Sequence, residues 1–207
     1  MPVPRSSTIS HQQLFQADPV LKALAAELSP QSWASTENVF HDLCSCIIEQ
    51  QIHYRSSKYV FQRLMQEAGL DLLTPENFHQ MEPVLPSMRL SETKYEALAR
   101  THSFFSESKI SWQRLSDEEV RRELAQIKGI GHWTVDMILL YTLHRPDIFP
   151  TDDYHLTQIM TRLYGLDPKK RLRENMLRIA EGWAGHRSLG VLYLLAWKDQ
   201  HIKRRKQ

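Results

Sequence analysis

Residues 124–135 read LAQIKGIGHWTV, and they contain two of the seven glycines in this chain of 207 residues. Upstream, Ser116 and Glu119 match the capping box that begins a helix. Downstream, apolar residues recur at helical spacing from Trp133 onward. We therefore expect two helices joined by a tight turn. Gly129 and Gly131 suit it, because glycine adopts backbone angles that other residues avoid and lets another backbone come close.

The turn is also expected to attract anions. The first amides of a helix point outward at the positive end of its dipole, where a phosphate binds well. Ile130, between the two glycines, is expected to pack back between the helices. The alternative is a plain helical turn whose glycines serve only as caps.

The rest of the chain also indicates helices. Apolar residues at helical spacing include Val39, Phe40, Leu43, Cys44, Ile47 and Ile48. Further helices are expected to begin at Thr74-Pro75-Glu76 and at Asp167-Pro168. Because no alternating strand pattern occurs, we predict an all-α fold. A proline-containing break at 145–150 predicts two helical subdomains, 40–145 and 1–39 plus 146–207, on either side of a cleft.

Composition narrows the function only slightly. The net charge is +2, and basic residues gather at 169–173 and in the C-terminal run KDQHIKRRKQ. The first residues lack the apolar core of a signal peptide, and no run is long enough to cross a membrane. The expected location is the cytoplasm or nucleoid, or the nucleus in a eukaryote. Cys44 and Cys46 are the only cysteines, and we expect reduced thiols and no side-chain metal site.

The letters of the turn resemble a known motif. Leu124-x-x-Ile127-x-Gly129-Ile130-Gly131-x-Trp133-Thr134 is similar to the helix-hairpin-helix of base-excision DNA glycosylases. Three further matches occur in the family's order, at Ile47–Ile52 upstream of the turn and at Phe149–Leu156 and His186-Arg187-Ser188 downstream of it. The chain most closely resembles the 3-methyladenine DNA glycosylase II family, which repairs alkylated bases, in a compact form without the extra sheet domain of larger members.

The resemblance implies a role for several residues. The implied contacts to the DNA backbone are Lys128, Gly129, Ile130, Gly131, His132 and Thr134. Gln51 and Ile52 correspond to the wedge that enters the minor groove. The implied pocket for the flipped base comprises Trp133, Tyr154, Met137 and Trp197. The partner would be double-stranded DNA with alkylated bases, bound by a monomer without a cofactor, although backbone carbonyls of the hairpin are a possible site for a monovalent cation.

A carboxylate is needed to stabilise the positive charge that develops on the sugar. Asp152 and Asp153 compete for that role, and both also suit a helix cap. The family pattern places the catalytic aspartate second, and related Asp-x-His motifs match only Asp153-Tyr154-His155. We therefore expect Asp153 to be catalytic and Asp152 to be the cap or an orienting residue.

Trp133 occupies the position where family members with lyase activity carry a nucleophilic lysine. An indole cannot form a Schiff base, so a monofunctional enzyme is expected. A non-catalytic DNA-binding module and a glycosylase for other damaged bases stay open as alternatives. The chain departs from the family at Glu49, His186, Met137 and Leu195, which bears mainly on the choice of damaged base.

Overall fold

The computed structural model describes residues 14–16, 18–29, 31, 35–49 and 54–204. Within those ranges every regular element is helical, so the prediction of an all-α fold is confirmed. The α-helices are α2 (Pro19–Glu27), α3 (Val39–Glu49), α4 (Tyr54–Glu67), α5 (Glu92–Glu107), α6 (Asp117–Ala125), α7 (His132–Met137), α8 (Tyr154–Leu163), α9 (Leu172–Glu181) and α10 (Arg187–Arg204). The shorter elements are the 3₁₀ turns η1 (Phe78–Gln80), η2 (Leu85–Met88) and η3 (Trp112–Arg114) and the π-helical turn η4 (Ile138–Thr142). No helix in the described part is long and apolar enough to cross a bilayer.

The chain folds as two compact units. One contains the described residues of Ala34–His144, and the other those of Met1–Trp33 and Arg145–Gln207. The sequence interpretation began the first unit at residue 40. Residues 35–38 nevertheless belong to it, because the hydroxyls of Ser35 and Thr36 donate to the carboxylate of Asp42 on α3. A cleft between the units stays a prediction.

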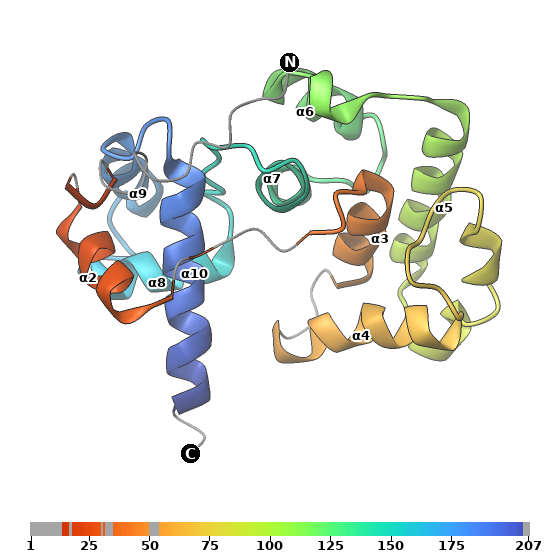
Figure 1. The fold of residues 1–207 in the computed structure, drawn as a ribbon, viewed down its shortest axis with the longest axis horizontal. Helices are drawn as coiled ribbons and strands as arrows, with labels where there is room; N and C mark the ends of the chain where they lie inside the picture. Colours follow the sequence, from red (N-terminus) through yellow and green to blue (C-terminus); the bar gives the residue numbers. More distant parts are fainter. Residues whose placement is uncertain (1–13, 17, 30, 32–34, 50–53, 205–207) are drawn as a thin grey trace. The chain divides into compact units, whose positions relative to one another are not determined.

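Helix α3 forms the core of the 34–144 unit. Its apolar residues at helical spacing are buried as the sequence predicts, and it packs against α4, α5, α7 and η4 (Figure 1). A polar contact also joins α3 to η4, since Thr142 Oγ1 donates a hydrogen bond to Asp42 Oδ2 at 2.7 Å. Burial lowers the pKa of His41, whose Nδ1 accepts from the backbone N–H of Leu73 at 2.9 Å. The hairpin therefore rests on a tightly packed helical layer.

Helix α10 organises the other unit, where it packs against α2 and α8 (Figure 1). The buried carboxylate of Asp18 caps α2 by accepting from the N–H groups of Val20 and Leu21. Its other oxygen accepts from Tyr164 Oη and from Trp183 Nε1, each at 2.9 Å. Burial and this neighbouring carboxylate raise the pKa of the Tyr164 hydroxyl, so it remains a donor. A carboxylate satisfied on both oxygens thus ties together three separate parts of the chain.

Two expected helix starts are wrong. The segment Thr74-Pro75-Glu76 enters a turn and the three-residue η1, because the Asn77 side chain accepts from Thr74 N and donates to Leu72 O. Asp167-Pro168 likewise forms a turn, and α9 begins only at Leu172, after a left-handed residue at Arg171. In both places, side chains and backbone close a turn before a helix can form.

Candidate active site and DNA-binding hairpin

The hairpin has the two helices that the sequence predicts. Ser116 and Glu119 form the complete capping box of α6, and Ile130 is buried between the glycines. The turn is closed by the Ile130 N–H, which donates to Ile127 O at 3.0 Å. Arg121 Nη1 on α6 lies 2.6 Å from Asp136 Oδ1 on α7, and this ion pair joins the two helices. The turn is therefore held at its apolar centre and by an ion pair.

The two glycines of the hairpin occupy different environments. Gly129 has a φ of +106°, and a Cβ added there would lie 2.9 Å from Ala97 Cβ on α5. Gly131 has an ordinary φ of −95°, and a Cβ there would meet nothing within 4 Å. The backbone and core therefore require glycine at 129 but not at 131. The open space beside Gly131 is compatible with the close approach of a second molecule.

The other predicted backbone contacts fall into two groups. Lys128 and His132 have exposed side chains, whereas the side chains of Ile130 and Thr134 are buried. At Ile130 and Thr134 only the main chain is suited to contact DNA. The carbonyls of Lys128 and Gly129 accept no hydrogen bond within the described residues. Such uncharged oxygens suit a monovalent cation, and its presence there stays a prediction.

Asp153 is the N-cap of α8. Its Oδ1 accepts from the Leu156 N–H at 2.6 Å, and the residue is only 6% exposed. The expectation that Asp152 is the cap is wrong, because the Asp153 N–H donates to Pro150 O and closes a turn that delays the helix by one residue. Asp152 is instead exposed, 3.7 Å from Arg173. Of the two carboxylates, Asp153 is the shielded one.

Two side chains next to Asp153 complete the start of α8. Tyr154 is 69% exposed, which is unusual for an aromatic ring, and its edge meets the ring of His155 at a centroid distance of 5.4 Å. On α10, Lys198 Nζ lies against Nδ1 of His155. The sequence interpretation used His155 only to fix the register of the aspartate and did not include Lys198. Its position three helical turns into α10 left no signal in the sequence.

Trp197 lies in the packing of α8 against α10. It is 8% exposed, stacks on His201 at 4.2 Å between ring centroids, and has the Arg162 guanidinium 5.1 Å from its ring centre. Met137, on α7, is also buried. Trp133 is half-buried and lies at the start of α7. Of the four predicted pocket residues, Tyr154 is by far the most accessible.

The segment His186-Arg187-Ser188 anchors the loop that leads to Asp153. Arg187 Nη1 lies 2.9 Å from Asp147 Oδ2, and Asp147 Oδ1 accepts from the N–H groups of Gly185 and Arg187. Ser188 Oγ accepts from the Ile148 N–H and donates to Arg145 O. This explains why an arginine and a serine occur together at the start of α10. Asp147, which the sequence interpretation did not select, is the partner of Arg187, whereas Ser188 bonds the backbone on either side of Asp147.

The comparison with protein families agrees with this architecture. The model of the HhH-GPD superfamily of base excision DNA repair proteins matches residues 44–184. The chain belongs to this superfamily. DNA-3-methyladenine glycosylase 1 of Schizosaccharomyces pombe is 29% identical over 188 residues, covering 88% of this chain and 81% of that protein.

Solved structures extend the likeness to the fold. A 3-methyladenine DNA glycosylase of S. pombe, in complex with abasic DNA, matches with a TM-score of 0.76 and 26% identity, covering 90% of this chain and 95% of that one. A DNA-3-methyladenine glycosidase from Bacillus halodurans matches with a TM-score of 0.73 at 22% identity, covering 94% and 91% of the two chains. The prediction of a helix-hairpin-helix glycosylase fold is thus confirmed.

Two further features of this HhH-GPD chain are the segment before the predicted wedge and a cavity. Gln51 and Ile52, the predicted wedge, are outside the described residues. Just before them in the chain, Ile48 O, near the end of α3, accepts a hydrogen bond from Lys94 Nζ at 2.7 Å.

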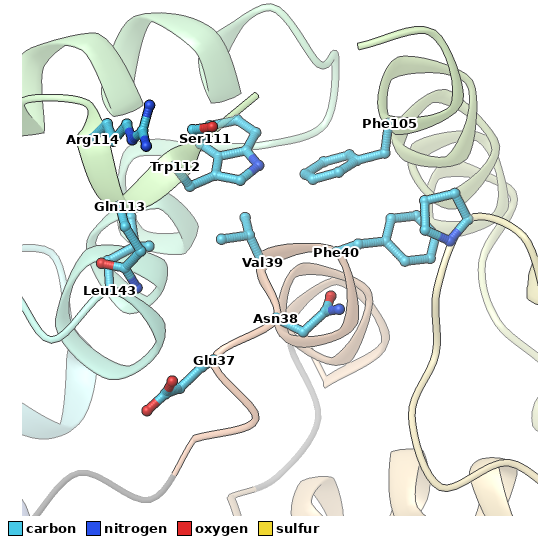
Figure 2. Close-up of a pocket in the computed structure, with 11 residues that line it drawn as sticks. Glu37, Asn38, Val39, Phe40, Phe105, Ser111, Trp112, Gln113, Arg114 and Leu143 are labelled. Atoms are coloured by element: carbon cyan, nitrogen blue, oxygen red, sulfur yellow. The ribbon is translucent and has the colours of Figure 1, made fainter. Parts of the chain in front are cut away.

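A cavity of about 420 Å³ lies in the 34–144 unit, and Figure 2 shows Trp112 and Phe105 along its wall. No predicted site residue lines this cavity.

The two cysteine thiols and the basic cluster at 169–173 do not have the environment of a reactive site. Cys44 and Cys46 are free, and burial raises the pKa of each, that of Cys46 to about 12. Among the described residues no group of three metal-ligating side chains occurs. In the 169–173 cluster, Lys170, Arg171 and Arg173 lie 3.5–3.7 Å from carboxylates of Asp167, Glu174 and Asp152. That cluster is therefore partly neutralised.

Proposed function

We propose that this chain is a monofunctional DNA glycosylase. It flips alkylated purines such as 3-methyladenine out of the duplex, hydrolyses the N-glycosidic bond and leaves an abasic site. The observation that carries the proposal is the shielded carboxylate of Asp153 beside the exposed ring of Tyr154. The names of the relatives, which are 3-methyladenine glycosylases, support the same class of substrate. It would act on chromosomal DNA, in the nucleoid or the nucleus, as a monomer.

Asp153 would act by its charge. Cleavage of the glycosidic bond leaves positive charge on the sugar, and a fixed carboxylate stabilises that charge most where water is excluded. The hydrogen bond from the Leu156 N–H holds one oxygen in place, so the carboxylate does not have to reorganise during the reaction. The same group is suited to orient the attacking water.

Recognition of the base would use aromatic faces. An alkylated purine is electron-poor and often cationic, and such rings are attracted to aromatic faces. Tyr154 is accessible for this purpose as it stands. Trp133 is the second candidate, at the start of α7. Met137 and Trp197 are buried, so contact of either side chain with a flipped base stays a prediction.

The hairpin would hold the DNA backbone without reading its sequence. Helix α7 begins after a residue that has no side chain to cap it, and the space beside Gly131 is open. Phosphate oxygens are the natural acceptors for main-chain amides at such a place. Lys128 and His132, both exposed, would add attraction to the same strand.

The direct test is release of free bases. The purified protein is incubated with methylated duplex DNA and the released bases are separated by chromatography. We expect 3-methyladenine to be released and the abasic strand to remain intact until it is cleaved by alkali. Borohydride is expected to trap no protein–DNA adduct, because residue 133 is tryptophan.

The outcomes separate the alternatives. Tight binding without base release would favour the non-catalytic module. Release of oxidised bases instead of methylated ones would favour a different damaged-base specificity. Borohydride trapping would overturn the monofunctional assignment, and Lys198, the lysine beside the start of α8, would be the first residue to examine.

A further inference from the structure

We propose that Lys198, held by His155, is a binding site for one DNA phosphodiester, next to the nucleotide on which Asp153 acts. This inference rests on the proposed function and adds a second backbone contact, separate from the hairpin. Its basis is a juxtaposition of two elements, since α10 places the Lys198 ammonium against the imidazole of His155, two residues after Asp153.

The hydrogen bond between Lys198 and His155 has a defined direction. A lysine ammonium only donates hydrogen bonds, so Nδ1 of His155 must accept. The imidazole is then neutral and carries its proton on Nε2. The contact restrains the long lysine side chain at the first turn of α8. His155 is therefore a positioning residue, and the charge of the site is that of Lys198.

The charge of the site excludes the flipped base as its ligand. An alkylated purine that is cationic would be repelled by an ammonium, whereas a phosphodiester would be attracted. The ligand must also lie close to the reacting sugar. Each deoxyribose in a strand is bonded to a phosphate through its 3′ and its 5′ oxygen, so two phosphates flank the sugar on which Asp153 would act and are the nearest anions of the strand.

Electrostatic balance supports the same ligand. Asp153 and Asp152 put two carboxylates where a phosphate-bearing strand must come, and like charges repel. Arg173 lies 3.7 Å from Asp152, whereas Lys198 lies against the first turn that follows Asp153. A cation at this position allows the enzyme to keep a catalytic carboxylate without repelling its own substrate strand.

The test measures how binding depends on salt. Affinity for a duplex containing an abasic analogue is measured by fluorescence anisotropy over a range of salt concentrations. Loss of one phosphate contact reduces the slope of log K against log salt by about 0.9 in magnitude. We expect that reduction for Lys198→Gln and not for Lys198→Arg, which keeps the charge. Lys22→Gln, at an exposed lysine of α2 in the same unit, is the matched control and should leave the slope unchanged.

A change in the DNA makes the test independent of protein folding. The phosphate on the 3′ or the 5′ side of the abasic analogue is replaced by an uncharged methylphosphonate. One of the two replacements should reduce the wild-type slope by about 0.9 and have no further effect on Lys198→Gln. His155→Gln should weaken binding in the wild-type background but not in the Lys198→Gln background, because it acts through the lysine.

Each result is decisive for the inference. If Lys198→Gln retains the wild-type slope, or if neither methylphosphonate couples to it, the phosphate site is wrong. Base release by the wild-type protein is measured separately. A wild type that releases methylated bases while Lys198 shows no coupling overturns this inference alone. A wild type that neither binds DNA nor releases bases overturns both this inference and the proposed function.

Discussion

Two helices of this protein begin in opposite ways. Helix α8 begins after Asp153, whose buried carboxylate accepts from the N–H of Leu156. Helix α7 begins after Gly131, which has no side chain and whose surroundings are open. Both starts carry the partial positive charge of a helix N-terminus. At α8 the protein supplies its own anion, while at α7 the N-cap among the described residues provides no side-chain cap.

The difference explains how one fold can serve two tasks in the proposed reaction. The carboxylate at α8 is fixed by the helix that it caps, so its charge is in place before the sugar becomes positive. The start of α7 is suited to an anion from outside, such as a phosphate of the DNA. Exchanging the two arrangements should therefore damage catalysis in one case and binding in the other.

The largest effect is expected from Asp153→Asn. Asparagine caps a helix about as well as aspartate, so folding should be preserved. Loss of the charge should reduce the rate of base release by about 10²-fold or more. Single-turnover release from methylated duplex measures this rate. Asp152→Asn, at the exposed neighbour, is the matched control and should cost much less; the reverse order would show that the catalytic register is shifted by one residue.

The next effect is expected from Gly131→Asp, which gives α7 the kind of start that α8 has. Aspartate is a preferred N-cap and φ at 131 is ordinary, so thermal stability should be equal or higher. The new carboxylate would repel a phosphate, and duplex binding should fall by about tenfold, or about 1.4 kcal/mol. Anisotropy on duplex with an abasic analogue measures it.

Two controls test whether the hairpin is the main contact. Gly131→Ala adds a small neutral group in open space and should weaken binding less than aspartate. Removal of residues 203–207, the basic end of the chain, should also weaken binding less, because the attraction of a basic run to DNA is non-specific and is screened by salt. If the truncation proves worse than a stably folded Gly131→Asp, the hairpin is not the main contact.

The contrast between α7 and α8 also separates what the sequence could predict from what it could not. The capping box at Ser116 and Glu119 and the buried face of α3 were predicted, because both depend on spacing within one helix. For Asp152 the sequence favours a cap or an orienting role, and the cap of α8 is the next residue, Asp153. A single hydrogen bond, from the Asp153 N–H to Pro150 O, decides that boundary, and either carboxylate suits a cap.

Contacts between distant segments were beyond local reasoning. The closeness of Lys198 to His155 depends on how α10 packs on α8, over a separation of 43 residues. The surroundings of Trp197 have the same origin in part, since Arg162 on α8 lies over a ring that also stacks on His201 of its own helix. Asp147, the partner of Arg187, is 40 residues away from it in the chain. Lys198 and Asp147 carry no signal of their own in the sequence, and each acquires its partner from the fold.

A third prediction sharpens the comparison within the hairpin, between its two glycines. Gly129→Ala must adopt a φ of +106° and brings its Cβ within 2.9 Å of Ala97 Cβ. We expect it to destabilise the protein by about 2 kcal/mol, through backbone strain and overpacking together. For a protein of this size that lowers the Tm by about 4–8 °C. Gly131→Ala should leave the Tm nearly unchanged.

A double variant identifies the cause of that loss. Ala97→Gly removes the atom that the new Cβ would meet, although glycine within helix α5 itself costs about 1 kcal/mol. If overpacking contributes, Gly129→Ala combined with Ala97→Gly should be less destabilised than the sum of the two single changes. Strict additivity would assign the whole effect to the backbone angle.

The smallest effect concerns the cap itself. Asp153→Ala removes the acceptor for the Leu156 N–H, and loss of an N-cap typically costs about 1 kcal/mol. Burial of a charge opposes this, because removing a shielded carboxylate also removes its desolvation cost. The hydrogen bond to Leu156 is short, at 2.6 Å, and the carboxylate lies at the positive end of α8. We therefore expect the loss of the cap to outweigh the desolvation term, so that Asp153→Ala is less stable than the wild type. Urea unfolding of Asp153→Ala and Asp153→Asn gives the comparison, provided that the slope with urea is the same for both. If Asp153→Ala instead unfolds at a higher urea concentration than the wild type, the carboxylate is held at α8 at a net cost in stability. The start of α8 would then be shaped by catalysis more than by folding.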